Sequence, residues 1–252
     1  VLMSELVSII TPCFNSEKFL DECITSVINQ TYKNWEMLIV DDNSSDNSSN
    51  IINSYFKKDD RIKPIFLKDN LGSAIARNTA ISRAKGKYLA FLDSDDFWLP
   101  EKLNVQINFM KKNNYSFVFS SYSVIPSNEK KPKYVISVPK KISYTKYLKN
   151  TIIGCLTVVI NKEKFKTIQM PNLRSSHDMA LWLNLLKEEK YAYGIQQELA
   201  VYREHKSSNT SNKFRAVCDV WNVYRKYEKL NVFYSTYNFI FYAYNAFKKR
   251  MT

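Results

Sequence analysis

Short apolar runs alternate with longer amphipathic segments over the first hundred residues. The runs are rich in β-branched residues, as strands are, and cover residues 6–10, 37–40, 62–67 and 88–92. Between them, apolar residues recur at helical spacing over residues 16–30, 46–57 and 73–84. This alternation predicts an α/β fold with a mostly parallel sheet flanked by helices.

Polar residues follow three of these predicted strands, at residues 11–15, 41–46 and 93–96. In an open parallel sheet, ligands bind in the crevice outside the carboxyl ends of the strands. We therefore expect the three polar segments to meet at one binding crevice.

After residue 100 the alternation is less regular. Helices are predicted over residues 101–112 and 177–188, strands over 117–124, 134–138 and 198–203, and an apolar run covers 152–160. Residues 214–247 are rich in aromatic side chains and lead into three consecutive basic residues. Because polar residues interrupt its uncharged stretch, this tail suits a segment that lies on a membrane better than one that crosses it.

Charge is distributed unevenly between the two parts of the chain. The 252 residues include 37 Lys and Arg and 24 Asp and Glu, a net charge of +13. The first hundred residues are slightly acidic, so the positive excess lies after residue 100 and predicts an anionic partner. Four glycines allow no glycine-rich phosphate loop. Scattered cysteines without metal-ligand spacing, and no leader pattern, favour a reducing, cytoplasmic setting.

Three carboxylates, Asp93, Asp95 and Asp96, follow the last of the four predicted strands. Neighbouring carboxylates repel one another, so such a cluster is costly unless a cation is bound there. Mg²⁺ and Mn²⁺ take oxygen ligands, and Mg²⁺ commonly bridges one or two carboxylates to substrate phosphates. The alternative is the start of a helix, where acidic residues are also favoured.

Several segments in the first half carry a resemblance to a known family. They cover residues 7–15, 40–46, Gly72 with 76–78, 84–88 and 93–96. In this order and spacing they resemble the family 2 glycosyltransferases with a GT-A fold. The resemblance covers residues 5–104 and continues more weakly through 176–183 and 202–208. It implies transfer of a sugar from a nucleotide diphosphate donor, usually a UDP-sugar, with inversion at the anomeric carbon.

The matching positions imply a site for the nucleoside of the donor. Uridine would lie against Thr11, Pro12, Asn15 and Asp42, and the Asp42 carboxylate would accept a hydrogen bond from the uracil N–H. The alternative for Asp41 and Asp42 is turn chemistry, which needs no ligand.

The acidic segment supplies the rest of the implied donor site. Asp93 would lie near the ribose, Asp95 would ligate Mn²⁺ or Mg²⁺ on the diphosphate, and Asp96 would face the donor sugar or the metal. Arg77 would lie close to the donor, although an ordinary surface arginine on a helix gives the same pattern.

An inverting transfer also needs a base, because the acceptor hydroxyl loses its proton as it attacks. The resemblance implies Asp178 as this base. His177 replaces the acidic residue that is commoner before it, which leaves three roles open: assisting the base, contacting the acceptor, or packing. The alternative for His177 and Asp178 is a structural one: a helix cap followed by an acid that the helix dipole stabilises.

The weaker motif at residues 202–208 implies further groups around the leaving group. Arg203 and Lys206 are expected to offset negative charge on the departing UDP. His205 matches a position that reaches the metal or the diphosphate, and a solvated loop histidine is its alternative.

These assignments predict three parts of the chain. Residues 1–100 form the nucleotide-sugar half of the GT-A domain, 101–212 the acceptor and catalytic half, and 213–252 a basic, aromatic, helical extension. The expected partners are UDP-galactose or UDP-glucose, a polyprenyl-diphosphate-linked saccharide acceptor and an anionic membrane, with the protein peripheral on its cytoplasmic face. The sequence leaves the oligomeric state open.

Two other functions compete with this hypothesis. A basic, aromatic tail is also found in nucleic-acid-binding proteins, but the acidic crevice would repel a phosphate backbone, so no nucleic-acid partner is expected. A sugar-phosphate nucleotidyltransferase could use the same metal site, but the glycine-rich loop expected near its N-terminus is missing.

Overall fold

The computed structural model describes residues 5–173, 175–204 and 213–251. Within them the strands form one mixed sheet of ten strands, ordered β3-β2-β1-β4-β9-β6-β10-β5, with β7 beside β6 and β8 beside β10. The strands are β1 (Val7–Cys13), β2 (Trp35–Asp41), β3 (Ile62–Phe66), β4 (Tyr88–Phe91), β5 (Phe97–Trp98), β6 (Phe117–Ile125), β7 (Tyr134–Ile136), β8 (Lys141–Ile142), β9 (Val159–Asn161) and β10 (Ala192–Arg203).

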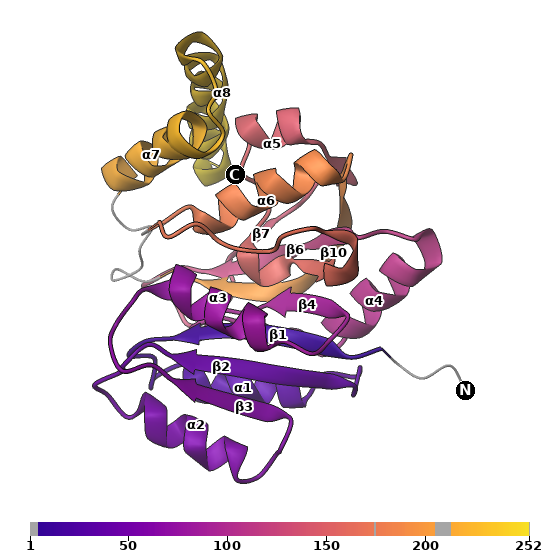
Figure 1. Ribbon diagram of the computed structural model, residues 1–252, viewed down its shortest axis with the longest axis vertical. Helices are drawn as coiled ribbons and strands as arrows, with labels where there is room; N and C mark the ends of the chain where they lie inside the picture. The colour runs from indigo at the N-terminus through magenta and orange to yellow at the C-terminus, as the bar shows by residue number, and fades with distance from the viewer. Residues whose placement is uncertain (1–4, 174, 205–212, 252) are drawn as a thin grey trace.

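Helices lie on both faces of this sheet, with α1 and α3 on opposite sides (Figure 1). The α-helices are α1 (Leu20–Ile28), α2 (Ser48–Phe56), α3 (Ser73–Arg83), α4 (Lys102–Asn113), α5 (Tyr144–Lys149), α6 (His177–Glu188), α7 (Lys213–Asn222) and α8 (Val232–Met251). Two 3₁₀ turns, η1 (Cys155–Thr157) and η2 (Lys162–Lys164), and a π-helical segment, η3 (Val223–Tyr227), complete the elements.

The first half of the sheet is built as its sequence pattern predicts. β3, β2, β1 and β4 are neighbours and run parallel. Every residue of β1, β2 and β4 is buried, because helices cover both faces, and this explains why apolar residues predominate in these strands.

The second half of the sheet mixes strand directions. β9 runs antiparallel to both of its neighbours, β4 and β6, and so joins the two halves into one sheet. β10 is parallel to β6, and β5 is antiparallel to β10. The continuous parallel arrangement predicted from the alternation therefore holds for β3, β2, β1 and β4, and it is interrupted where β9 enters the sheet antiparallel to β4 and β6.

Two glycines are required by the backbone around β4 and α3. A Cβ at Gly86 would lie 2.6 Å from the backbone nitrogen of Ser8, so only glycine lets the turn before β4 pack this closely against β1. Gly72 has a φ of +91° at the start of α3, a conformation that L side chains rarely adopt.

The C-terminal helices pack against the second half of the domain (Figure 1). Glu228, just after η3, accepts a hydrogen bond from Tyr144 of α5 and one of 2.9 Å from Lys187 of α6. Trp221 of α7 meets Phe239 of α8 edge to face. Among the described residues, no helix has both the length and the apolar character needed to cross a membrane.

Candidate active site

The polar segments that follow β1, β2 and β4 open onto one cavity of about 980 Å³. The first half of the domain supplies residues 12–19, Asp42, Asp46, Ser73, Arg77 and the acid loop, which we define as residues 93–96. The second half supplies Tyr122, residues 154–156, residues 175–178 and Tyr202. The crevice predicted at the carboxyl ends of the strands is therefore confirmed.

Two neighbouring carboxylates, Asp41 and Asp42, have different roles after β2. The Asp41 carboxylate accepts from the backbone N–H and hydroxyl of Ser44, and from the hydroxyl of Ser49, which is the turn chemistry considered above. The Asp42 carboxylate accepts from the backbone N–H groups of Leu71 and Gly72, at 2.8 and 2.7 Å. Asp42 also lines the cavity, and a carboxylate has acceptor capacity beyond two hydrogen bonds.

The loop after β1 forms the neighbouring wall. Pro12 and Asn15 line the cavity, and the Asn15 side-chain oxygen accepts from the backbone N–H of Ser45 at 2.9 Å. Thr11 is fully buried, and its hydroxyl has no hydrogen-bond partner within the described structure. Asn15 thus ties the first polar segment to the second.

The acid loop carries closely spaced negative charge. Burial, and next the charge of Asp93, raise the pKa of Asp95 to about 6. Burial, and next the charges of Asp95 and Asp93, raise the pKa of Asp96 well above its ordinary value. Asp95 and Asp96 are therefore harder to ionise than in water, and a cation beside the loop would lower this cost.

This arrangement fits a divalent cation that takes only a few protein ligands. The described residues contain no cluster of three or more His, Cys, Asp or Glu side chains suited to a metal. Mg²⁺ usually keeps several waters and binds through one or two carboxylates plus substrate phosphates, so Asp95 on the cavity wall suits such an ion. The other predicted ligand, His205, lies outside the described residues, as does Lys206.

Arg77 joins the acid loop to the start of α6. Its side chain is buried, which rules out the surface-arginine alternative. One terminal nitrogen forms an ion pair with Asp93, and the other contacts Nε2 of His177. Asp178, the next residue, lies in the first turn of α6 and lines the same cavity.

The family of the protein follows from its sequence. The sequence model of the protein family described as "Glycosyl transferase family 2" matches residues 8–168, well over half of the chain. The chain belongs to this glycosyltransferase family. Neither competing function, nucleic-acid binding or nucleotidyl transfer, is supported by this match.

Two relatives of similar length illustrate the family. The transferase is 45% identical over 246 residues to the putative teichuronic acid biosynthesis glycosyltransferase TuaG of Bacillus subtilis, with 98% of each chain covered. It is 42% identical over 219 residues to the Escherichia coli protein WfgD, described as a UDP-Glc:α-D-GlcNAc-diphosphoundecaprenol β-1,3-glucosyltransferase, with 86% of this chain and 85% of WfgD covered.

A solved structure shows the fold. The mannosyltransferase PcManGT from Pyrobaculum calidifontis, in complex with GDP-Man and Mn²⁺, superposes with a TM-score of 0.70 at 16% identity. The match covers 89% of this chain and 64% of PcManGT. The transferase thus has the GT-A fold expected from its sequence.

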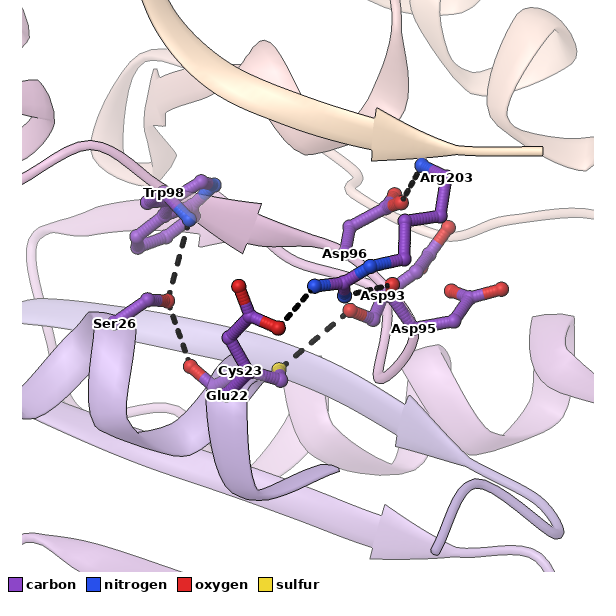
Figure 2. Close-up of polar contacts among 8 residues, drawn as sticks. All are labelled: Glu22, Cys23, Ser26, Asp93, Asp95, Asp96, Trp98 and Arg203. Carbon is purple, nitrogen blue, oxygen red and sulfur yellow. Dashed lines mark hydrogen bonds and ion pairs between the residues drawn. The ribbon is translucent and has the colours of Figure 1, made fainter. Parts of the chain in front are cut away.

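Arg203 lies differently from the position expected for a donor ligand. Its guanidinium donates to the backbone carbonyl of Asp95 at 2.7 Å and pairs with Glu22 of α1, as Figure 2 shows. Its backbone N–H donates to the Asp96 carboxylate at 2.8 Å. The side chain also packs on the rings of Phe19 and Phe97. Arg203 therefore stabilises the acid loop through Asp95 and Asp96, and it is not part of the cavity wall formed by the described residues.

Several cavity residues carried no recognisable signal in the sequence. Gly154, Cys155 and Leu156 come from the apolar run that divides into η1 and β9, and they reach the cavity because η1 turns back toward it. Glu22, which pairs with Arg203, is an acid in the first turn of an amphipathic helix and resembles any solvent-facing acid there.

The position of Arg203 predicts a role in stability. Arg203→Met should lower the free energy of unfolding by about 2–3 kcal/mol, because the buried hydrogen bonds of the guanidinium are lost and Asp96 keeps its negative neighbours without the positive charge that offsets them. Urea unfolding of this variant measures the change, with exposed Arg83→Met as the matched control. Unchanged stability together with a large loss of UDP affinity would instead indicate that Arg203 binds the donor.

Proposed function

We propose that this glycosyltransferase moves a hexose, with inversion, from a UDP-sugar to a lipid-diphosphate-linked N-acetylhexosamine in the synthesis of a surface polysaccharide. One observation supports this most: Asp42, the acid loop, Arg77 and Asp178 converge on one cavity. The description of WfgD names UDP-glucose as donor and GlcNAc-diphosphoundecaprenol as acceptor, so we favour UDP-glucose over UDP-galactose here.

The nucleotide is proposed to bind along the first half of the cavity. Asp42 is fixed beside it by two backbone N–H groups and retains capacity to accept from the uracil N–H. Asp93 would accept from the ribose hydroxyls, while its partner Arg77 supplies positive charge close to the diphosphate.

The metal is proposed to be Mn²⁺ or Mg²⁺, held by Asp95 together with donor phosphates, with His205 as a further candidate ligand. PcManGT, a protein of the same fold, was solved with Mn²⁺. When bound, the cation offsets the negative charge that develops on the departing nucleotide diphosphate.

Asp178 is proposed to accept the proton of the acceptor hydroxyl. It lies on the cavity wall, next in sequence to His177, which shares the Arg77 guanidinium with Asp93. Asp178 therefore lies next to a residue that contacts Arg77, close to the proposed donor site. A direct displacement requires the base to be near the reacting groups in this way.

The metal assignment predicts a loss of metal-dependent ligand binding in Asp95→Asn. Wild-type protein should unfold at a temperature several degrees higher when UDP and Mn²⁺ are both present, since a ligand that binds only the folded state stabilises it. The Mn²⁺-dependent part of this shift should vanish in Asp95→Asn and persist in Asp60→Asn, an exposed acid remote from the cavity. Equal shifts in all three proteins would contradict the assignment.

If Asp178 is the base, an enzyme that lacks its carboxylate should turn over slowly. Asp178→Asn should bind UDP normally but release UDP from UDP-glucose and a GlcNAc-diphosphate lipid at least 100-fold more slowly, because general bases contribute roughly 10²–10⁴-fold. Glu188→Gln, at the far end of α6, is the control. A kcat equal to that of wild type in Asp178→Asn would refute this role, and absence of wild-type turnover with any UDP-hexose would refute the proposed function.

The membrane is the proposed location of the acceptor, and α8 offers a surface for it. Phe233, Ile240 and Tyr244 are 88%, 61% and 63% exposed at helical spacing. Residues 232–251 contain no Asp or Glu, and Lys149 of α5 lies over the ring of Tyr237 on the same helix. Exposed aromatic side chains flanked by cations suit an anionic bilayer surface.

Replacing this surface should release the protein from vesicles. The triple variant Phe233→Ser, Ile240→Ser and Tyr244→Ser should bind vesicles of phosphatidylcholine and phosphatidylglycerol at least about tenfold more weakly, because each buried side chain contributes roughly 1.5–3 kcal/mol. The double variant Phe56→Ser and Val135→Ser, which removes exposed apolar side chains elsewhere, should bind normally. Unchanged binding, or a dimer that only the triple variant loses, would contradict the membrane assignment.

A further inference from the structure

His177 is enclosed between two groups that determine which of its nitrogens carries the proton. The residue is buried at the start of α6. Its Nε2 faces a terminal N–H of Arg77, and its Nδ1 lies 3.2 Å from the backbone carbonyl oxygen of Leu173. One neighbour of the ring is therefore a donor and the other is an acceptor.

The protonation state follows from these two contacts. The Arg77 guanidinium always carries its protons, and the nearby carboxylates favour that charge further, so the group can only donate. Nε2 must then present its lone pair. A backbone carbonyl can only accept, so Nδ1 must carry the hydrogen. Both contacts are satisfied by one species, the neutral ring protonated on Nδ1.

We propose that His177 is a positioning residue: as a neutral acceptor it fixes the buried guanidinium of Arg77 between the acid loop and the start of α6. This inference rests on the proposed function, and it assigns a role that the sequence left open. A carboxylate at this position would compete with Asp93 for Arg77, whereas a neutral imidazole holds the guanidinium and leaves its charge for Asp93 and the donor.

The charges around His177 make this arrangement sensitive to acid. Arg77 faces it from α3, Asp93 from the acid loop and Asp178 from its own helix, while the thiol of Cys155 on η1 lies near Arg77. Burial, and next the Arg77 charge, lower the pKa of His177 below its ordinary value near 6.5, although both carboxylates act in the opposite direction. Protonation would place two donors face to face and break the contact.

The sign of the pH effect follows from this shift. The folded chain binds the His177 proton less readily than the unfolded chain, so the unfolded state carries more protons as pH falls below about 6.5. The stability that His177 contributes is therefore present above about pH 6.5, and it is lost as pH falls through the folded value.

Nitrogen NMR tests the tautomer without any measurement of activity. The chain contains two histidines, His177 and His205, so ¹⁵N-histidine labelling of the full protein gives two ring spin systems, and His205→Gln identifies the signals of His177. At pH 7.5 we expect Nδ1 of His177 to show the shift of a protonated nitrogen and Nε2 that of an unprotonated one. A ring protonated on Nε2, or on both nitrogens, would overturn the proposal.

Two substitutions test the positioning role. His177→Leu removes the acceptor and should lower kcat/KM for the donor about tenfold or more, as expected for loss of a hydrogen bond to a charged group. His177→Gln offers an amide oxygen to Arg77 and should recover most of that loss. It should also lose stability less steeply than wild type between pH 7.5 and 5.5, in thermal unfolding.

The same variants separate this proposal from the proposed function. If His177 only packs, the Leu and Gln variants should have equal activity, and this result would overturn the positioning role. If the enzyme has no UDP-hexose activity, the tautomer still tests the Arg77 contact, because it does not depend on turnover.

Discussion

The buried guanidinium of Arg77 is the interaction on which the arrangement of the site depends. It is the point where α3, the acid loop and the start of α6 meet, and these elements come from widely separated parts of the chain. A buried arginine cannot lose its proton, so the structure must surround it with acceptors. Asp93 and His177 provide them for the two terminal nitrogens, and in doing so they link the acid loop to the start of α6, where Asp178 lies.

A second arginine, Arg203, stabilises the same acid loop through contacts with Asp95 and Asp96. It reaches the loop because β5, which follows the loop directly, pairs with β10, whose last residue is Arg203. The two contacts differ in kind. Arg77 meets a side-chain carboxylate on the cavity wall, whereas Arg203 holds a backbone carbonyl and leaves the Asp95 carboxylate on the cavity side. The loop is thereby fixed in place while its negative charge stays directed at the cavity.

The sequence predicted the first half of the domain well because its information is local. Parallel strands buried on both faces must be apolar runs, and their polar ends must meet at one edge, so the positions of Asp42 and Asp95 follow from periodicity and topology. Arg203 and Glu22 could not be placed in this way. Their pairing depends on the antiparallel contact of β5 with β10, and nothing local in either segment specifies that contact. The η1 residues were missed for a similar reason, since an apolar run gives no sign that it will turn.

The net charge of +13 therefore does not describe the surface that the substrate meets. The cavity has acidic side chains from both halves of the domain, and its described lining also includes two basic side chains, buried Arg77 and exposed Lys18. The carboxylates of the acid loop would repel an anionic nucleotide diphosphate in this cavity, and the two basic side chains would attract it. Recognition of such a donor thus requires the charge of the acid loop to be offset before or as the donor binds. Burial, and next the charge of Asp93, raise the pKa of Asp95 to about 6, so a cation bound beside the acid loop would lower the cost of ionising this carboxylate.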